Sequence, residues 1–216
     1  MIKLYSPKRA ERIITSLDDE ITLICRTLHL PTAVLKAVLY KEISEIDAFD
    51  PLADTVVALN LQRTRLLQTL PESQNSRHKP SVLQKYDSST GYGQIFARTA
   101  ILAIRFAAER EILPTSALGL GEHRVLSPDS PSDRAEIWRK LHNDQTFNLI
   151  CTALNLIYAA WEMTGKTNFE NLTPEEIKLV FTRYNADVRQ ITLYGEITYR
   201  YYMHYLGNQG SYADNE

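Results

Sequence analysis

One carboxylate, Glu42, stands out because it ends an apolar helical pattern. Residues 31–43, "PTAVLKAVLYKEI", place an apolar stripe and this glutamate on one face at steps of three and four: Leu35, Val38, Leu39 and Glu42. Apolar surroundings and the negative end of a helix dipole both raise the pKa of a carboxyl group. A raised pKa is what a general acid needs near neutral pH. The alternative is a glutamate at a helix end that points into solvent.

A second stretch, "KYDSSTGYGQIF" at residues 85–96, interrupts the helical pattern with two closely spaced glycines. Glycine lets a backbone bend tightly or lets another molecule approach it. We therefore expect a turn at which a ligand passes Gly91 and Gly93, with the Gln94 amide able to donate and accept hydrogen bonds. Asp87 heads this turn and has two interpretations: a loop cap that bonds nearby backbone amides, or a second catalytic carboxylate.

Other candidate motifs fail on their context. "TGKT" at 164–167 follows a helix and lacks the earlier glycine of a phosphate-binding loop, and "GLGEH" at 119–123 lacks the third glycine and the preceding strand of a dinucleotide site. No serine lies in a nucleophile-elbow pattern. The five histidines, at positions 29, 78, 123, 142 and 204, show no metal-ligand spacing. We therefore expect neither a metal nor a cofactor.

Composition limits the class of protein. A chain of 216 residues with 44% hydrophobic and 23% charged residues is expected to form one globular domain. The formal charge of −2 provides no overall field for nucleic acid or a membrane, so neither is an expected partner. The N-terminal residues lack the apolar run of a signal peptide, which predicts a protein that is cytoplasmic at synthesis. Cys25 and Cys151 lie in helical apolar patterns and are expected to be buried thiols.

Helical periodicity dominates the elements that would position these residues. One helix is expected over 97–112, and another begins at Asp50 with Pro51 at its first position. A third is expected over 147–161. It is apolar nearly all round and should therefore be central. "TPEE" at 173–176 is a capping box that opens another helix. The fold class is therefore all-α, with at most a short β-hairpin near the glycines.

Four segments, in this order, carry a resemblance to a known family. They are "LPTAVLKAVLYKE", "STGYGQIFARTAI", "DQTFNLICTALNLIYAAW" and "VFTRYNADV". Together they resemble the lysozyme-like domain of soluble lytic transglycosylases and goose-type lysozymes, over about residues 31–206. The resemblance implies a single lysozyme-like domain over 1–216, with an inserted helical and loop segment at about 46–86. It also implies an enzyme that cleaves the β-1,4 bond between N-acetylmuramic acid and N-acetylglucosamine in peptidoglycan.

The resemblance assigns roles to particular residues. Glu42 corresponds to the general acid, Gln94 to a glutamine that lines the cleft, and Tyr184 to a tyrosine whose hydroxyl approaches the catalytic carboxyl. Further residues correspond to the substrate-binding turn, to the Tyr-Asn pair and to the start of the central helix: Ser89, Gly91, Tyr92, Asn185 and Asn148. The chain departs from the family's pattern at Ile43, where a serine is usual, at Asp187, where a glycine is usual, and in the length of the inserted segment.

The sequence leaves the second step of the reaction open. Glycosidases usually use two carboxyl groups, whereas lytic transglycosylases use one glutamate and the C6 hydroxyl of the sugar. One alignment of the glycines makes Asp87 a water-placing aspartate and the other does not, and Asp47, Asp50 and Asp54 are further candidates.

A second hypothesis is a catalytically inactive glycan-binding or protein-interaction module of the same fold, with the tyrosines over 194–205 stacking on sugar rings. Either protein would have to reach the cell wall by lysis or by non-classical export. An antibacterial effector of this kind would be paired with an immunity or inhibitor protein.

Overall fold

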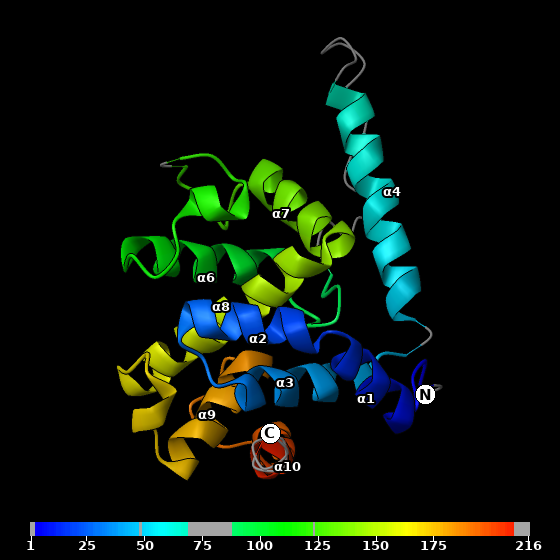
Figure 1. Ribbon diagram of the computed structural model, residues 1–216. Coiled ribbons are helices and arrows are strands. Elements are labelled where there is room, and N and C mark those ends of the chain that lie inside the picture. The colour runs from blue at the N-terminus through cyan, green and yellow to red at the C-terminus, as the bar shows by residue number, and fades with distance from the viewer. Residues whose placement is uncertain (1–2, 48, 69–87, 123, 210–216) are drawn as a thin grey trace.

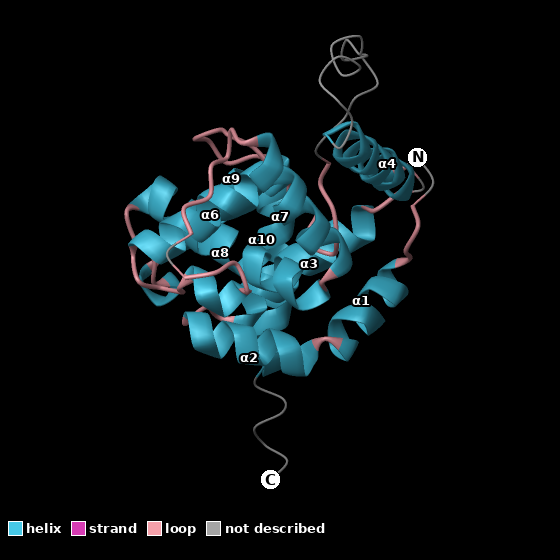
Figure 2. Cartoon of the chain, turned by 90° about the horizontal axis from the view of Figure 1, so that it is seen from above, coloured by secondary structure: helices cyan, strands magenta, loops and turns pink. Residues whose placement is uncertain are grey.

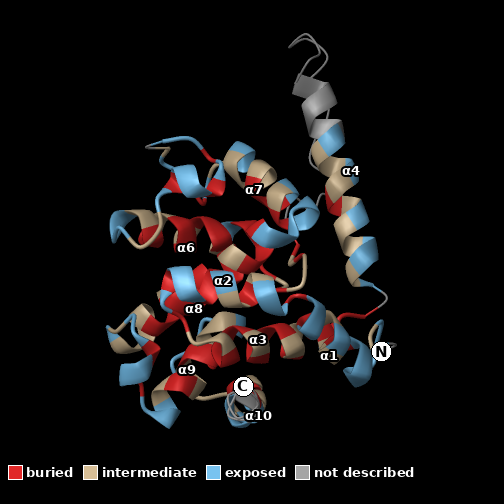
Figure 3. Ribbon diagram, viewed as in Figure 1, coloured by how far each residue is buried: buried red, intermediate tan, exposed pale blue. Residues whose placement is uncertain are grey.

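The longest helix of the core, α8 (Gln145–Thr164), is buried along most of its length. The structure is a computed structural model, and it describes residues 3–47, 49–68, 88–122 and 124–209. The Asp144 side chain caps α8 by accepting a hydrogen bond from the Phe147 N–H, and Gly165 ends the helix with a positive φ of 73°. Figure 3 shows α8 inside the bundle, with buried residues on the helices around it. The apolar pattern over 147–161 therefore does mark the central helix.

Some of the other helices pack directly on α8 and others lie one layer further out. In chain order they are α1 (Pro7–Ser16), α2 (Asp18–Leu28), α3 (Thr32–Glu45), α4 (Asp50–Gln68), α6 (Ala97–Glu109), α7 (Pro131–Asn143), α9 (Pro174–Asn185) and α10 (Leu193–Gln209), with short 3₁₀ helices η1 (Thr115–Leu118) and η2 (Phe169–Asn171). On one side, α6 and α7 pack against α8 and against each other. On the other side α9 contacts α8, and α10 packs between α9 and α3 (Figure 1).

The described part of the chain is all-α, as the periodicity predicts (Figure 2). Within it no strand forms near the glycines: a single antiparallel bridge joins Thr90 to Ile95. The predicted capping box is present at the start of α9, where Thr173 and Glu176 each bond the other's backbone N–H. Cys25 and Cys151 are both free and buried, and burial raises the pKa of the Cys25 thiol to about 12. No described helix is both long enough and apolar enough to cross a bilayer.

Helix α4 occupies the predicted inserted segment and stands beside the bundle (Figure 1). It begins at Asp50 with Pro51 next, as expected, and its main helical neighbour is α7. Asp54 joins it to the rest of the molecule: its carboxylate accepts hydrogen bonds from the hydroxyls of Ser88 and Thr90, at 2.7 and 2.8 Å. The insertion is therefore held through the turn that leads to the two glycines. Most of its remaining residues, 69–86, lie outside the described part of the chain.

Candidate functional site

Glu42 lies in the last turn of α3 and faces a cavity of about 160 Å³. Residues from α3, the glycine turn, α6, α8 and α9 line this cavity: Glu42, Ser89, Gln94, Ile95, Phe96, Thr99, Asn155, Tyr184 and Asn185. The cavity therefore brings together Glu42 and four other residues singled out in the sequence, from segments far apart along the chain. Ile95, Phe96, Thr99 and Asn155 line it as well, and no pattern in the sequence pointed to them.

Burial governs the acid–base chemistry of Glu42. Desolvation raises the pKa of Glu42 from 4.5 to about 7, against the hydrogen bond from Tyr194 and the charge of Lys41, which lower it. The charges of Glu45 and Asp50 raise it further. Near neutral pH this carboxyl is therefore divided between its protonated and ionised forms, so it can both donate and accept a proton.

The residue that holds the Glu42 carboxyl is Tyr194, in the first turn of α10. Its hydroxyl donates a short hydrogen bond to Oε1 of Glu42. Burial and the neighbouring Glu42 carboxylate hold the pKa of Tyr194 well above its usual value, so the phenol stays protonated and remains a donor. One carboxyl oxygen is thus fixed by the protein and Oε2 is left for a ligand.

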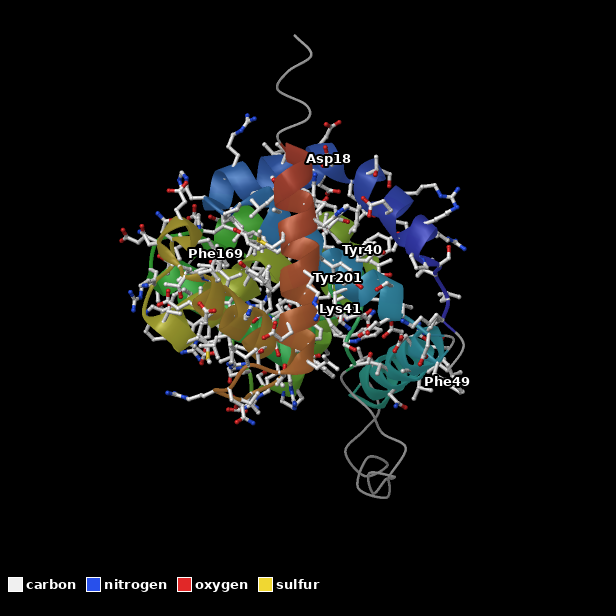
Figure 4. The ribbon with its side chains drawn as sticks, turned by 90° about the horizontal axis from the view of Figure 1, so that it is seen from below. Asp18, Tyr40, Lys41, Phe49, Phe169 and Tyr201 are labelled. Atoms are coloured by element: carbon white, nitrogen blue, oxygen red, sulfur yellow. The ribbon has the colours of Figure 1, made fainter. Side chains whose placement is uncertain are left out.

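Lys41 lies against the other side of the Tyr194 ring. Its Nζ is 4.9 Å from the ring centroid and forms an ion pair with Glu45 one turn later. Although charged, the residue is only 5% exposed, and it lies next to α10 (Figure 4). A cation over an aromatic face is attracted to the ring. Tyr194 is therefore held at its ring face by Lys41 and at its hydroxyl by Glu42.

The resemblance places the Tyr184 hydroxyl near the catalytic carboxyl, but the hydroxyl that bonds this carboxyl is that of Tyr194. Tyr184 does line the Glu42 cavity, but its hydroxyl donates to the backbone oxygen of Gly93. The contact joins the C-terminal end of α9 to the glycine turn. Tyr194 contacts Glu42 instead because α10 packs directly against α3. A tyrosine at the start of a helix gave no signal of this contact in the sequence.

The two glycines of the turn accommodate side chains of α8. A Cβ on Gly91 would lie 2.2 Å from Nδ2 of Asn148, and one on Gly93 would lie 1.9 Å from Oγ1 of Thr152. Asn148 also accepts a hydrogen bond from the Gly93 N–H at 3.0 Å and donates to the Thr90 carbonyl at 2.9 Å. The close approach that glycine permits is thus made by the protein's own central helix.

The Gln94 amide is held inside the turn. Its Nε2 donates to the Gly91 carbonyl at 2.9 Å, and its Oε1 accepts from the Ser89 hydroxyl at 3.1 Å. Gln94 also has a positive φ of 44°, which is uncommon for a residue other than glycine and is often associated with functional sites. Its side chain nevertheless lines the Glu42 cavity, so it shapes that cavity while both ends of its amide bond the turn.

Gly91 and Tyr92 lie outside the Glu42 cavity. They line a neighbouring cavity of about 510 Å³ between the turn, α4 and α7, and Gln94 lines both cavities. Asp50 and Asp54 from α4 line the larger cavity too. Asp54 is occupied by its bonds to the turn and lies 3.4 Å from Nδ1 of His142.

The remaining carboxylate candidates take local roles or lie outside the structure. The Asp47 carboxylate accepts a hydrogen bond from the Phe49 N–H at 2.7 Å, and the Asp50 carboxylate accepts one from the Asp47 N–H at 2.8 Å. Asp87 lies outside the described residues. Among the described residues that line the Glu42 cavity, Glu42 is thus the one carboxylate.

Several tyrosines of α10 that were considered for sugar stacking pack against other side chains of the protein. Tyr201 meets Tyr40 edge to face at 4.5 Å between ring centroids (Figure 4), and the hydroxyl of the buried Tyr205 donates to Glu11. Tyr199 and Tyr202 pack against each other at 5.7 Å. No group of histidine, cysteine and acidic residues in the described ranges is arranged to hold a metal ion.

Comparisons with known proteins leave the family open. No family model matches the chain, and no solved structure matches it. The chain is 23% identical over 138 residues to a lysine–tRNA ligase of Halalkalibacterium halodurans. The match covers 62% of this chain and 23% of the ligase, so the chain spans about a quarter of the length of that protein.

Proposed function

We propose that the chain is a glycosidase that cleaves the β-1,4 bond between N-acetylmuramic acid and N-acetylglucosamine in peptidoglycan. The observation that carries the proposal is the state of Glu42: a carboxyl with a pKa near 7 that lines a cavity. The cavity also contains Gln94, Tyr184 and Asn185, the residues that the resemblance to lytic transglycosylases and goose-type lysozymes places beside the acid. The all-α fold is compatible with that resemblance.

In the proposed reaction Glu42 acts first as acid and then as base. The protonated Oε2 gives its proton to the glycosidic oxygen while the bond from that oxygen to the anomeric carbon breaks. The ionised carboxylate then removes a proton from the hydroxyl that attacks the anomeric carbon. Tyr194 donates to Oε1 throughout, so the proton transfers take place at the other oxygen.

The composition of the cavity favours attack by the C6 hydroxyl of the muramic sugar over attack by water. Glycosidases that place a water normally use a second carboxylate for it. Among the described residues lining the cavity, Glu42 has no carboxylate beside it. An intramolecular attack needs no second carboxylate, because the attacking hydroxyl belongs to the substrate. The expected product is therefore a 1,6-anhydro-muramic end.

Incubation of the purified protein with purified peptidoglycan tests the proposal. Soluble fragments are analysed by mass spectrometry, in which an anhydro end is lighter than a reducing end by one water. Glu42→Gln keeps the shape and removes the proton, so we expect it to release no fragments. Equal release by both proteins, or none by either, would contradict the assignment of Glu42. Fragments with a reducing end would keep the role of Glu42 as the acid and would mean that the second step is hydrolysis instead of intramolecular transfer.

A glycan-binding module without catalysis is the alternative. It is favoured by the small size of the cavity and by the internal hydrogen bonds of Gln94. Binding of peptidoglycan without any turnover, unchanged in Glu42→Gln, would support this module. The partner in both cases is a peptidoglycan strand. We propose that the protein reaches it by lysis or by a non-classical route of export. A paired immunity protein belongs to the same proposal. The ligase match covers too little of that protein to support tRNA aminoacylation.

A further inference from the structure

Three polar side chains form a stripe along α8, a helix that is otherwise apolar over its buried length. Asn148, Thr152 and Asn155 are spaced at i, i+4 and i+7, so they lie on one face. All three are buried, at 2%, 0% and 3% exposure. A polar residue at such positions costs free energy unless its polar atoms are hydrogen bonded.

The first two residues of the stripe are hydrogen bonded within the protein. Asn148 binds the Gly93 N–H and the carbonyls of Thr90 and Leu141. The Thr152 hydroxyl donates to the Asn148 carbonyl at 2.9 Å, and Thr152 packs against Gly93. Their presence on the helix is therefore explained by the glycine turn.

Asn155 differs from both. Its side chain makes no hydrogen bond to any described residue, although the residue is only 3% exposed. It lines the Glu42 cavity. Among the described residues, the one fully buried side-chain polar atom without a hydrogen bond is Oε2 of Glu162. The amide of Asn155 therefore keeps access to the cavity it lines, where it can bond a bound group beside Glu42.

The walls of the cavity define the group that would satisfy this amide. Ile95 and Phe96 provide apolar surface, and no lysine or arginine is among the described residues that line the cavity. The volume of about 160 Å³ is below the range of about 300 to 1,000 Å³ typical of complete small-molecule sites. The cavity therefore fits a neutral substituent that has both an amide and a methyl group.

We propose that Asn155 is a specificity-determining residue that hydrogen bonds the acetamido group of an amino sugar bound beside Glu42. The acetamido amide meets the Asn155 side chain and its methyl group meets the apolar wall formed by Ile95 and Phe96. The inference rests on the proposed function to the extent that the ligand is an amino sugar. Beyond that function, it specifies the substituent that is recognised, the acetamido group, and the residue that recognises it, Asn155.

Binding measurements on Glu42→Gln, which prevents turnover, test this role. The probes are the β-1,4-linked tetramer of N-acetylglucosamine and the corresponding tetramer of glucosamine, titrated by calorimetry. We expect the acetylated tetramer to bind at least about 5-fold more tightly, as the loss of one hydrogen bond to a buried group implies. Adding Asn155→Leu should abolish this preference. Adding Asn171→Leu, at an exposed position of η2, should leave it unchanged.

Thermal unfolding distinguishes a lost contact from a lost fold. Leucine has the same branched shape and number of side-chain heavy atoms as asparagine, and it needs no hydrogen-bond partner. Asn155→Leu should therefore unfold at the same temperature as the parent protein or higher. An unchanged preference in a folded Asn155→Leu protein would overturn the role of Asn155 while leaving peptidoglycan cleavage intact. If neither tetramer binds and peptidoglycan is not cleaved, the proposed function fails and this inference fails with it.

Discussion

The burial of Glu42 predicts that its replacement stabilises the protein at high pH. In Glu42→Gln the amide oxygen can still accept the hydrogen bond from Tyr194, whereas the half-buried negative charge is removed. The pKa of Glu42 is raised from 4.5 to about 7 by desolvation. A group whose pKa is raised in the folded protein binds its proton more tightly there, so the folded protein loses stability as the pH rises through this window.

The size of the effect follows from the two pKa values. Each pH unit between them corresponds to about 1.36 kcal/mol, so 4.5 and about 7 give a difference of about 3 kcal/mol above pH 7. At pH 4 the carboxyl is protonated in both the folded and unfolded states, and the glutamine variant should match the native protein. At pH 8 the variant should be more stable by about 3 kcal/mol.

Urea denaturation followed by circular dichroism at pH 4 and pH 8 measures this difference. Comparing the two proteins at each pH cancels the titration of all other groups. Glu175→Gln is the matched control because Glu175 is exposed in the first turn of α9, and its effect should be small at both values. The reasoning is refuted if the stability gained by Glu42→Gln is the same at pH 4 and pH 8.

Three further predictions concern the surroundings of the site. Lys41→Met should raise the pKa of Glu42 because a neighbouring positive charge is lost, whereas Lys41→Arg keeps the charge and should leave the pKa unchanged. The chemical shift of the Glu42 carboxyl carbon, followed against pH, measures this pKa in both variants. Equal titration curves for the two variants would disprove the effect. Gly93→Ala should cost about 1 to 3 kcal/mol of unfolding free energy because its Cβ would meet the hydroxyl of a threonine on α8 at 1.9 Å. Gly207→Ala is the control, because nothing lies within 4 Å of a Cβ at that position. Urea denaturation should show a loss of stability in the first variant and none in the second. Asp54→Ala removes the carboxylate that accepts hydrogen bonds from two hydroxyls and so joins α4 to the turn. Hydrogen exchange should then show faster opening of α4, while α8 stays protected. Equal protection of α4 in the native protein and in Asp54→Ala would contradict this.

Local patterns in the sequence predicted the elements of the fold well. The capping box of α9, the proline at the start of α4 and the all-round apolar pattern of α8 each depend on a few neighbouring residues, and each is present in the structure. Helix α7 was not among the predicted helices. Its cap, Ser130, is a normal helix signal.

Contacts between distant segments were harder to predict. The glycines of the turn do mark a place of close approach, but the approaching atoms belong to Asn148 and Thr152, more than fifty residues later. Tyr184 and Tyr194 are both close enough to Glu42 for its charge to raise their pKa values. Which hydroxyl reaches the carboxyl depends on how α10 packs against α3, and no local pattern specifies that packing.

The same dependence on packing explains how one glutamate acquires its raised pKa. Glu42 lies in the last turn of a helix whose apolar face is fully buried, and α10 covers it with Tyr194. Desolvation by this packing outweighs the lowering effects of Tyr194 and Lys41. The inserted helix α4 contributes Asp50, whose charge raises the pKa further, while α4 itself lines only the neighbouring cavity. The insertion should therefore affect which substrate reaches the larger cavity more than it affects proton transfer at Glu42.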